Sequence, residues 1–70
     1  MRVTVTALAC GHIHIKDAVT GALLYASTLS ELRQEMRDGD PLLMQIRYVA
    51  RTSGSTLAKA KTAIEAADFV

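Results

Sequence analysis

Apolar and polar residues alternate near the start of the chain, and this pattern constrains the fold more than any other feature of the sequence. Residues 2–7 alternate between polar side chains and β-branched or small apolar ones, and residues 12–16 repeat the pattern. A period of two is typical of a half-buried strand. After the second segment, Asp17 can bond its own backbone two residues on, and Gly21 can supply a positive φ. The sequence therefore predicts two strands and a hairpin turn, with a returning third strand over 22–26.

A helix is predicted over residues 29–38. Thr28 and Glu31 have the spacing of a capping box, in which the threonine side chain bonds an amide of the first turn and the glutamate reaches back. Three signals for the end of the helix follow in close order: Arg37, Gly39 and Pro41. A cation suits the last turn, glycine can take the left-handed position after it, and proline cannot continue it.

Residues 42–51 fit two secondary structures. Apolar or aromatic side chains occupy every second position from Met44 to Tyr48, which indicates a strand, and the β propensity of Tyr48 and Val49 agrees. A helical spacing also links Leu42, Ile46 and Val49. We favour the strand. If the segment is helical instead, residues 42–68 form a helix–turn–helix pair.

A further helix is expected from about Thr56, after a turn at residues 53–55, with small and apolar side chains along one face. The predicted fold is a single α+β domain spanning residues 1–70. Its order is β-β-β-α-β-α in two layers, a mainly antiparallel sheet with two helices packed on one face.

Composition limits how such a domain can be stabilised and where it works. The chain has 70 residues, no tryptophan and one cysteine, so an internal disulfide is excluded and the core is thin. A homodimer is one way to supplement that core. No run of residues is apolar enough for a membrane span and the N-terminus lacks a signal-peptide pattern, so we expect a cytoplasmic protein. Separately, we expect that the protein needs no cofactor.

One group of residues could bind a metal. Cys10, His12 and His14 have the same parity, so on one continuous strand they would share a face, and thiolate and imidazole are natural zinc ligands. A solvated polar face is the competing interpretation, which we favour. Catalysis by Cys10 and His12 is not expected, because side chains two apart on a strand lie about 6–7 Å apart. We therefore expect no enzymatic activity.

Charge placement gives the main candidate surface. The polar faces of the predicted strands carry basic and neutral side chains, whereas the acidic residues fall on or beside the helices. The candidate partner-binding residues are Arg2, His12, His14, Lys16, Gln45, Arg47 and Arg51. Both tyrosines are predicted to point into the core or along its edge, so this face lacks the exposed aromatics of single-strand nucleic-acid platforms.

Three functional hypotheses follow. The leading one is a non-enzymatic protein-binding module, an inhibitor or adaptor of the kind that phages and other mobile elements encode, which contacts an acidic protein surface through the basic sheet face. The first alternative is nucleic-acid binding by that face, or by a C-terminal helix–turn–helix with residues 55–62 as the recognition helix. The second alternative is a small metal-binding protein that uses Cys10, His12 and His14. A net charge of +1 at pH 7 commits the chain to none of them.

Overall fold

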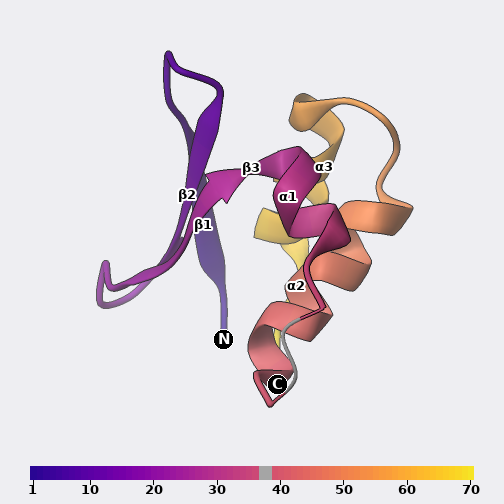
Figure 1. Ribbon diagram of the computed structural model, residues 1–70. Coiled ribbons are helices and arrows are strands. Elements are labelled where there is room, and N and C mark those ends of the chain that lie inside the picture. The colour runs from indigo at the N-terminus through magenta and orange to yellow at the C-terminus, as the bar shows by residue number, and fades with distance from the viewer. Residues whose placement is uncertain (37–38) are drawn as a thin grey trace.

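The computed structural model describes residues 1–36 and 39–70, and places three strands before three helices (Figure 1). The elements are β1 (Val3–Ala7), β2 (His12–Asp17), β3 (Leu23–Thr28), α1 (Leu29–Gln34), α2 (Pro41–Thr52) and α3 (Leu57–Ala66). The predicted α+β class is confirmed. The predicted order is wrong in one element, because the order is βββααα.

The sheet is an antiparallel meander in the order β1-β2-β3. Val5 lies opposite Ile15, and Ile15 lies opposite Tyr25, so these buried side chains form one inward row across all three strands. The predicted turn between β2 and β3 is confirmed. Asp17 Oδ1 accepts the backbone N–H of Val19 at 2.8 Å, and Gly21 has a φ of 75°.

The predicted start of α1 is confirmed and its predicted length is not. The Thr28 side chain accepts the backbone N–H of Glu31 at 3.1 Å, as in a capping box. The Glu31 carboxylate does not complete the box, because it accepts the hydroxyl of Ser27. The helix ends at Gln34, and the expected last turn at residues 37–38, including Arg37, lies outside the described residues.

Residues 41–52 form helix α2, so the strand expected over 42–51 is wrong. The Asp40 side chain accepts the backbone N–H of Leu43 at 3.2 Å and caps the helix, and Pro41 occupies its first turn. Leu43, Ile46 and Ala50 are buried. Their spacing of three and four residues is helical, and it outweighs the short alternation within the segment.

Helix α3 begins close to where the sequence predicts. The Thr56 side chain accepts the backbone N–H of Lys59 at 3.2 Å, and Ala60 and Ile64 are buried along one face. The turn between α2 and α3 is four residues long, from residue 53 to residue 56.

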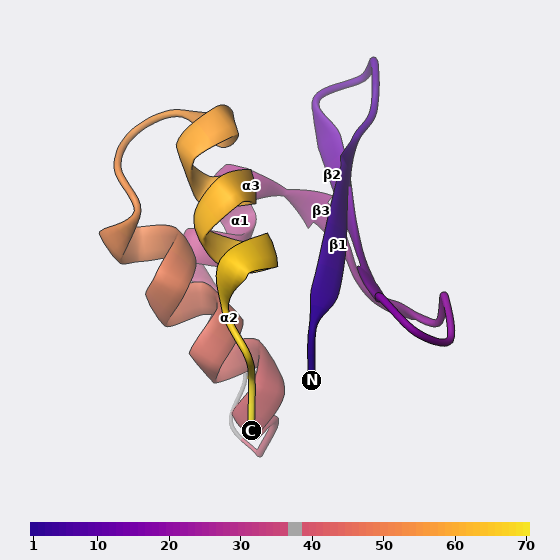
Figure 2. The ribbon, with the colours of Figure 1, turned by 180° about the vertical axis from the view of Figure 1, so that it is seen from behind.

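All three helices lie on the same side of the sheet, and its other face is left uncovered (Figures 1 and 2). Helix α1 contacts β3, α3 contacts β1, and α2 packs against both of these helices. The core between the layers includes side chains from every element, among them Ile13, Leu32, Ile46 and Ile64. None of the helices among residues 1–36 and 39–70 has the length and apolar character that crossing a membrane requires.

Candidate functional site

The seven candidate residues do not form one surface. Gln45, Arg47 and Arg51 lie on α2, on the helical side of the molecule. The other four lie on or next to the first two strands: Arg2, His12, His14 and Lys16. The single basic sheet face expected from the sequence is therefore divided in two, because the segment that should have supplied half of it is a helix.

The part of that face that remains on the sheet is weakly charged. His14 lies opposite Thr6 and Lys16 lies opposite Thr4, on the outer rows of the sheet. The guanidinium of Arg2 turns away to the end of α3, where its Nε and Nη2 donate to the carbonyl of Glu65 at 3.1 and 2.8 Å. Among the candidate residues on the described outer rows, Lys16 is then the side chain with a permanent positive charge. The two histidines are taken as neutral at pH 7.

Of the three candidate metal ligands, the structure brings only Cys10 and His12 close together. Cys10 precedes β2 in a turn, with Gly11 at a φ of 89°, and Cys10 Sγ lies 3.2 Å from Nδ1 of His12. The expected separation of 6–7 Å is wrong because Cys10 is not on the strand. His14 does not join the pair in a ligand set, and within residues 1–36 and 39–70 no group of three His, Cys, Asp or Glu side chains could hold a metal ion.

A stronger concentration of positive charge lies among the helices. Arg33 of α1 and Arg47 and Arg51 of α2 line a surface hollow of about 470 Å³ together with Gln34 and Gly54. We call these three arginine side chains the arginine cluster. None of the described residues that line this hollow is acidic.

Hydrogen bonds to the backbone hold two members of the arginine cluster, Arg33 and Arg47, in place. Arg33 Nε donates to the carbonyl of Ala50 at 2.9 Å, and its Nη2 donates to the carbonyl of Gly54. These carbonyls belong to the C-terminal end of α2 and the turn after it, where backbone acceptors lack helical partners. Arg47 Nε donates to the carbonyl of Arg33 at 3.1 Å, near the end of α1. Backbone groups at the ends of two helices therefore orient both guanidinium groups.

One acidic side chain lies near the arginine cluster: Glu35 lines a small hollow together with Arg47. Two ion pairs lie elsewhere on the molecule, and they join the N-terminal ammonium of Met1 to Asp68 and Lys61 to Glu65. Arg33 and Arg47 are half-buried and Arg51 is exposed.

Lys59 adds a fourth positive charge at the start of α3. Its side chain runs over Gly54, so closely that a Cβ atom on this glycine would meet Lys59 Cδ at 3.0 Å. Lys59 is exposed, and so are Ala58 and Thr62 on the same part of α3. Lys61, two residues further along α3, is half-buried and paired with Glu65 at 2.8 Å.

Sequence reasoning misses two features of this side of the molecule. Arg33 is not among the predicted site residues, because nothing in its local pattern shows that it reaches the end of α2. Tyr48 is expected in the core or at its edge, but it is 69% exposed on α2, where Met44 is 49% exposed. Once α2 is known to be helical, the burial of Leu43 and Ile46 places Tyr48 outside.

Comparison with known proteins does not place the chain in a family. The chain matches no protein-family model, no curated protein and no solved structure.

Proposed function

We propose that this chain binds nucleic acid, and that the arginine cluster and Lys59 contact the phosphate backbone. The observation that carries the proposal is the helical structure of residues 41–52, which places Arg47 and Arg51 beside Arg33. The planar guanidinium fork matches the geometry of phosphate oxygens, and arginine binds them in a bidentate manner.

The hydrogen-bond capacity of the arginine cluster supports this assignment. A guanidinium carries five N–H donors, and the bonds described above use two groups of Arg33 and one of Arg47. The same side chains line an open hollow of about 470 Å³. A phosphate oxygen there would meet guanidinium groups whose positions are already fixed by the backbone of α1 and α2.

The pair α2–α3 gives the protein an element that can read a groove. Two helices joined by a four-residue turn have the connectivity of a helix–turn–helix, in which the second helix enters the major groove of duplex DNA. The exposed side chains at the start of α3 are small or polar, with Ala58, Lys59 and Thr62 among them. Small side chains allow close approach to the groove, so we infer duplex DNA as the preferred form.

The uncovered sheet face supports the alternative, an acidic protein partner, less well. That face retains Lys16 as its fixed charge among the described residues, whereas four cationic side chains gather around the turn between α2 and α3. Attraction to a polyanion rises with the number of phosphates neutralised. The helical side is therefore the better candidate for an anionic partner.

Fluorescence anisotropy with a labelled DNA duplex at low salt tests the proposal with a matched pair of variants. Arg51→Glu and Lys16→Glu change the net charge equally, and they lie on opposite sides of the molecule. Arg51→Glu is expected to weaken binding about tenfold, and Lys16→Glu to change it less than about twofold. Equal losses in the two variants, or no binding by the wild type, would overturn the proposal, and a loss confined to Lys16→Glu would assign the anionic partner to the sheet face.

A further inference from the structure

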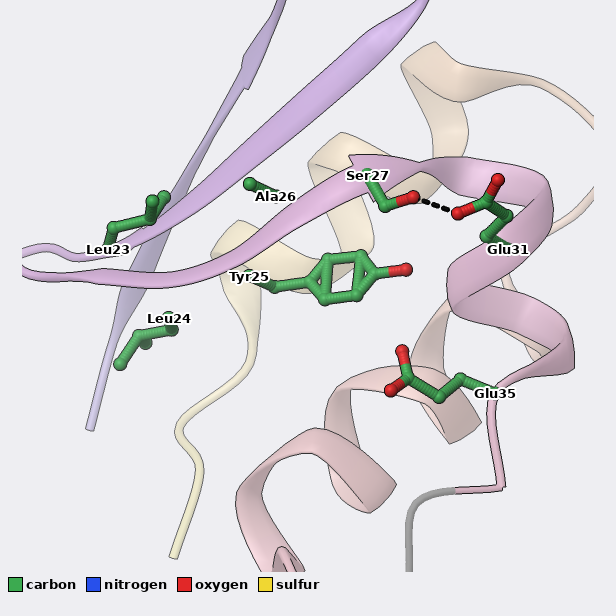
Figure 3. Close-up of a pocket in the computed structure, with 7 residues that line it drawn as sticks. All are labelled: Leu23, Leu24, Tyr25, Ala26, Ser27, Glu31 and Glu35. Carbon is green, nitrogen blue, oxygen red and sulfur yellow. Dashed lines mark hydrogen bonds between the residues drawn. The ribbon is translucent and has the colours of Figure 1, made fainter.

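The two edge strands of the sheet, β1 and β3, differ in how far other parts of the chain cover them. On the β1 edge, the backbone N–H of Val5 donates to Glu65 Oε2 at 2.9 Å, and the carbonyl of Met1 accepts the backbone N–H of Phe69 at 2.8 Å. On the outer side of β3 lies a surface hollow of about 550 Å³ (Figure 3). An open strand edge presents backbone donors and acceptors that another chain can pair with.

The pairing pattern shows which backbone groups face that hollow. The N–H of Asp17 donates to the carbonyl of Ala22 at 2.9 Å, so the odd-numbered residues of β2 direct their backbone groups toward β3. Ile15 is opposite Tyr25, and the backbone groups of Tyr25 therefore face β2. Backbone direction alternates along a strand, so the N–H and C=O of Ala26 face outward into the hollow.

The walls of the hollow are acidic and partly apolar. Its floor is β3 from Leu23 to Ser27, and its wall includes Glu31 of α1 and Glu35 at the C-cap of that helix, one helical turn apart. Figure 3 shows both carboxylates on the side of α1 that faces the Tyr25 ring. Burial raises the pKa of Tyr25, and the charges of Glu35 and Glu31 raise it further, which agrees with a negative potential at this place. None of the described residues that line this hollow is basic.

We propose that the outer edge of β3 binds an extended segment of a partner protein by strand addition, and that lysine or arginine side chains of that segment contact Glu31 and Glu35. Main-chain hydrogen bonds to the edge supply affinity in this mode, and side-chain contacts on alternate positions supply specificity. The acidic wall selects for a basic segment.

A second copy of this chain fits the edge less well than a basic segment. Antiparallel pairing of two β3 strands would bring the hairpin of one copy toward the α1 of the other. Residues 17–28, which form that hairpin and strand, contain no lysine or arginine. Glu31 and Glu35 would then meet no opposite charge from the added strand.

The test uses two fluorescein-labelled peptides with an alternating valine pattern, one with lysine and one with glutamate at the polar positions. The wild type is expected to bind the lysine peptide at least about tenfold more tightly than the glutamate peptide. The double variant Glu31→Gln, Glu35→Gln keeps the side-chain shapes and should lose most of that preference. Ala26→Pro removes an outward N–H and should lose binding of both peptides, because proline cannot donate to an added strand.

Circular dichroism spectra of each variant show whether it folds, and the glutamine variant keeps the test informative if the proline variant does not. Equal affinity for the two peptides, no binding by the folded wild type, or a concentration-dependent dimer that Ala26→Pro dissolves would overturn the proposal. Arg51→Glu, which tests the nucleic-acid surface, should leave peptide binding unchanged, so the two proposals can fail separately.

Discussion

The carboxylate of Glu65 accepts the backbone N–H of Val5 at 2.9 Å, and so a side chain of α3 occupies a hydrogen-bonding position that a neighbouring strand would otherwise take. The same carboxylate pairs with Lys61 at 2.8 Å. This contact joins the last helix to the first strand and covers part of the β1 edge. Strand addition is therefore expected at β3 and not at β1.

Replacing this carboxylate should destabilise the protein. Glu65→Ala leaves the N–H of Val5 without its acceptor, and we expect the free energy of unfolding to fall by about 1 kcal/mol. Glu65→Gln retains an amide oxygen that can accept the bond and should lose less. Urea denaturation measures both variants. An alanine variant as stable as the wild type would show that the contact contributes nothing.

The pKa of Glu65 makes stability depend on pH. The hydrogen bond and charge of Lys61 and the N–H of Val5 hold the pKa of this carboxyl below its ordinary value of 4.5. The folded state therefore binds a proton less readily than the unfolded chain, and the stabilising contribution is complete above the ordinary value and is lost as pH falls through the lowered one. Thermal melts between about pH 6 and about pH 3 should show falling stability, with a shallower fall in Glu65→Gln. Identical pH profiles for the two proteins would contradict this account.

The N-cap of α2 offers a test of the helix that replaces the expected strand. The side chain of Asp40 accepts the backbone N–H of Leu43, and Asp40→Ala should cost about 1 kcal/mol of stability. Asp40→Ser retains a capping oxygen and should cost less. Far-ultraviolet circular dichroism and urea denaturation measure the effect. A neutral alanine substitution would be inconsistent with a helix that begins at this cap.

Zinc should leave the thermal stability unchanged. The sulfur of Cys10 and the ring of His12 lie close together, but a catalytic zinc site needs three protein ligands and the described residues supply no such group. The melting temperature with and without zinc measures this directly. A rise that disappears in the double variant His12→Ala, His14→Ala would contradict the prediction.

The parts of the fold that can be predicted are those with local signals. Side-chain caps at Thr28 and Thr56 and the turn at Asp17 are encoded by residues within three positions of one another. The prediction for residues 42–51 is wrong because two periodicities overlap there. Ala50 is the residue that distinguishes the helical period from the strand period, because its burial completes the helical spacing that begins at Leu43. Alanine is only weakly hydrophobic, so the sequence does not show that this position is buried.

The candidate site is less predictable than the fold, because it depends on contacts between elements. The sequence places Arg47 and Arg51 on a sheet as partner-binding residues, and they lie on a helix. Arg33 joins them through contacts with α2 and the turn after it, including its bonds to the carbonyls of Ala50 and Gly54, which lie 17 and 21 residues further along the chain. No local pattern specifies a contact of that kind.

The salt dependence of DNA binding tests the central claim most directly. Phosphate contacts release counterions, so the logarithm of the affinity should fall linearly with the logarithm of the salt concentration, with a slope of about three to four for a site made by the arginine cluster and Lys59. The double variant Arg47→Ala, Arg51→Ala should bind more weakly and lower the slope by about two. A wild-type affinity that does not change with salt, or the same slope in the variant, would contradict the assignment of this surface to nucleic acid.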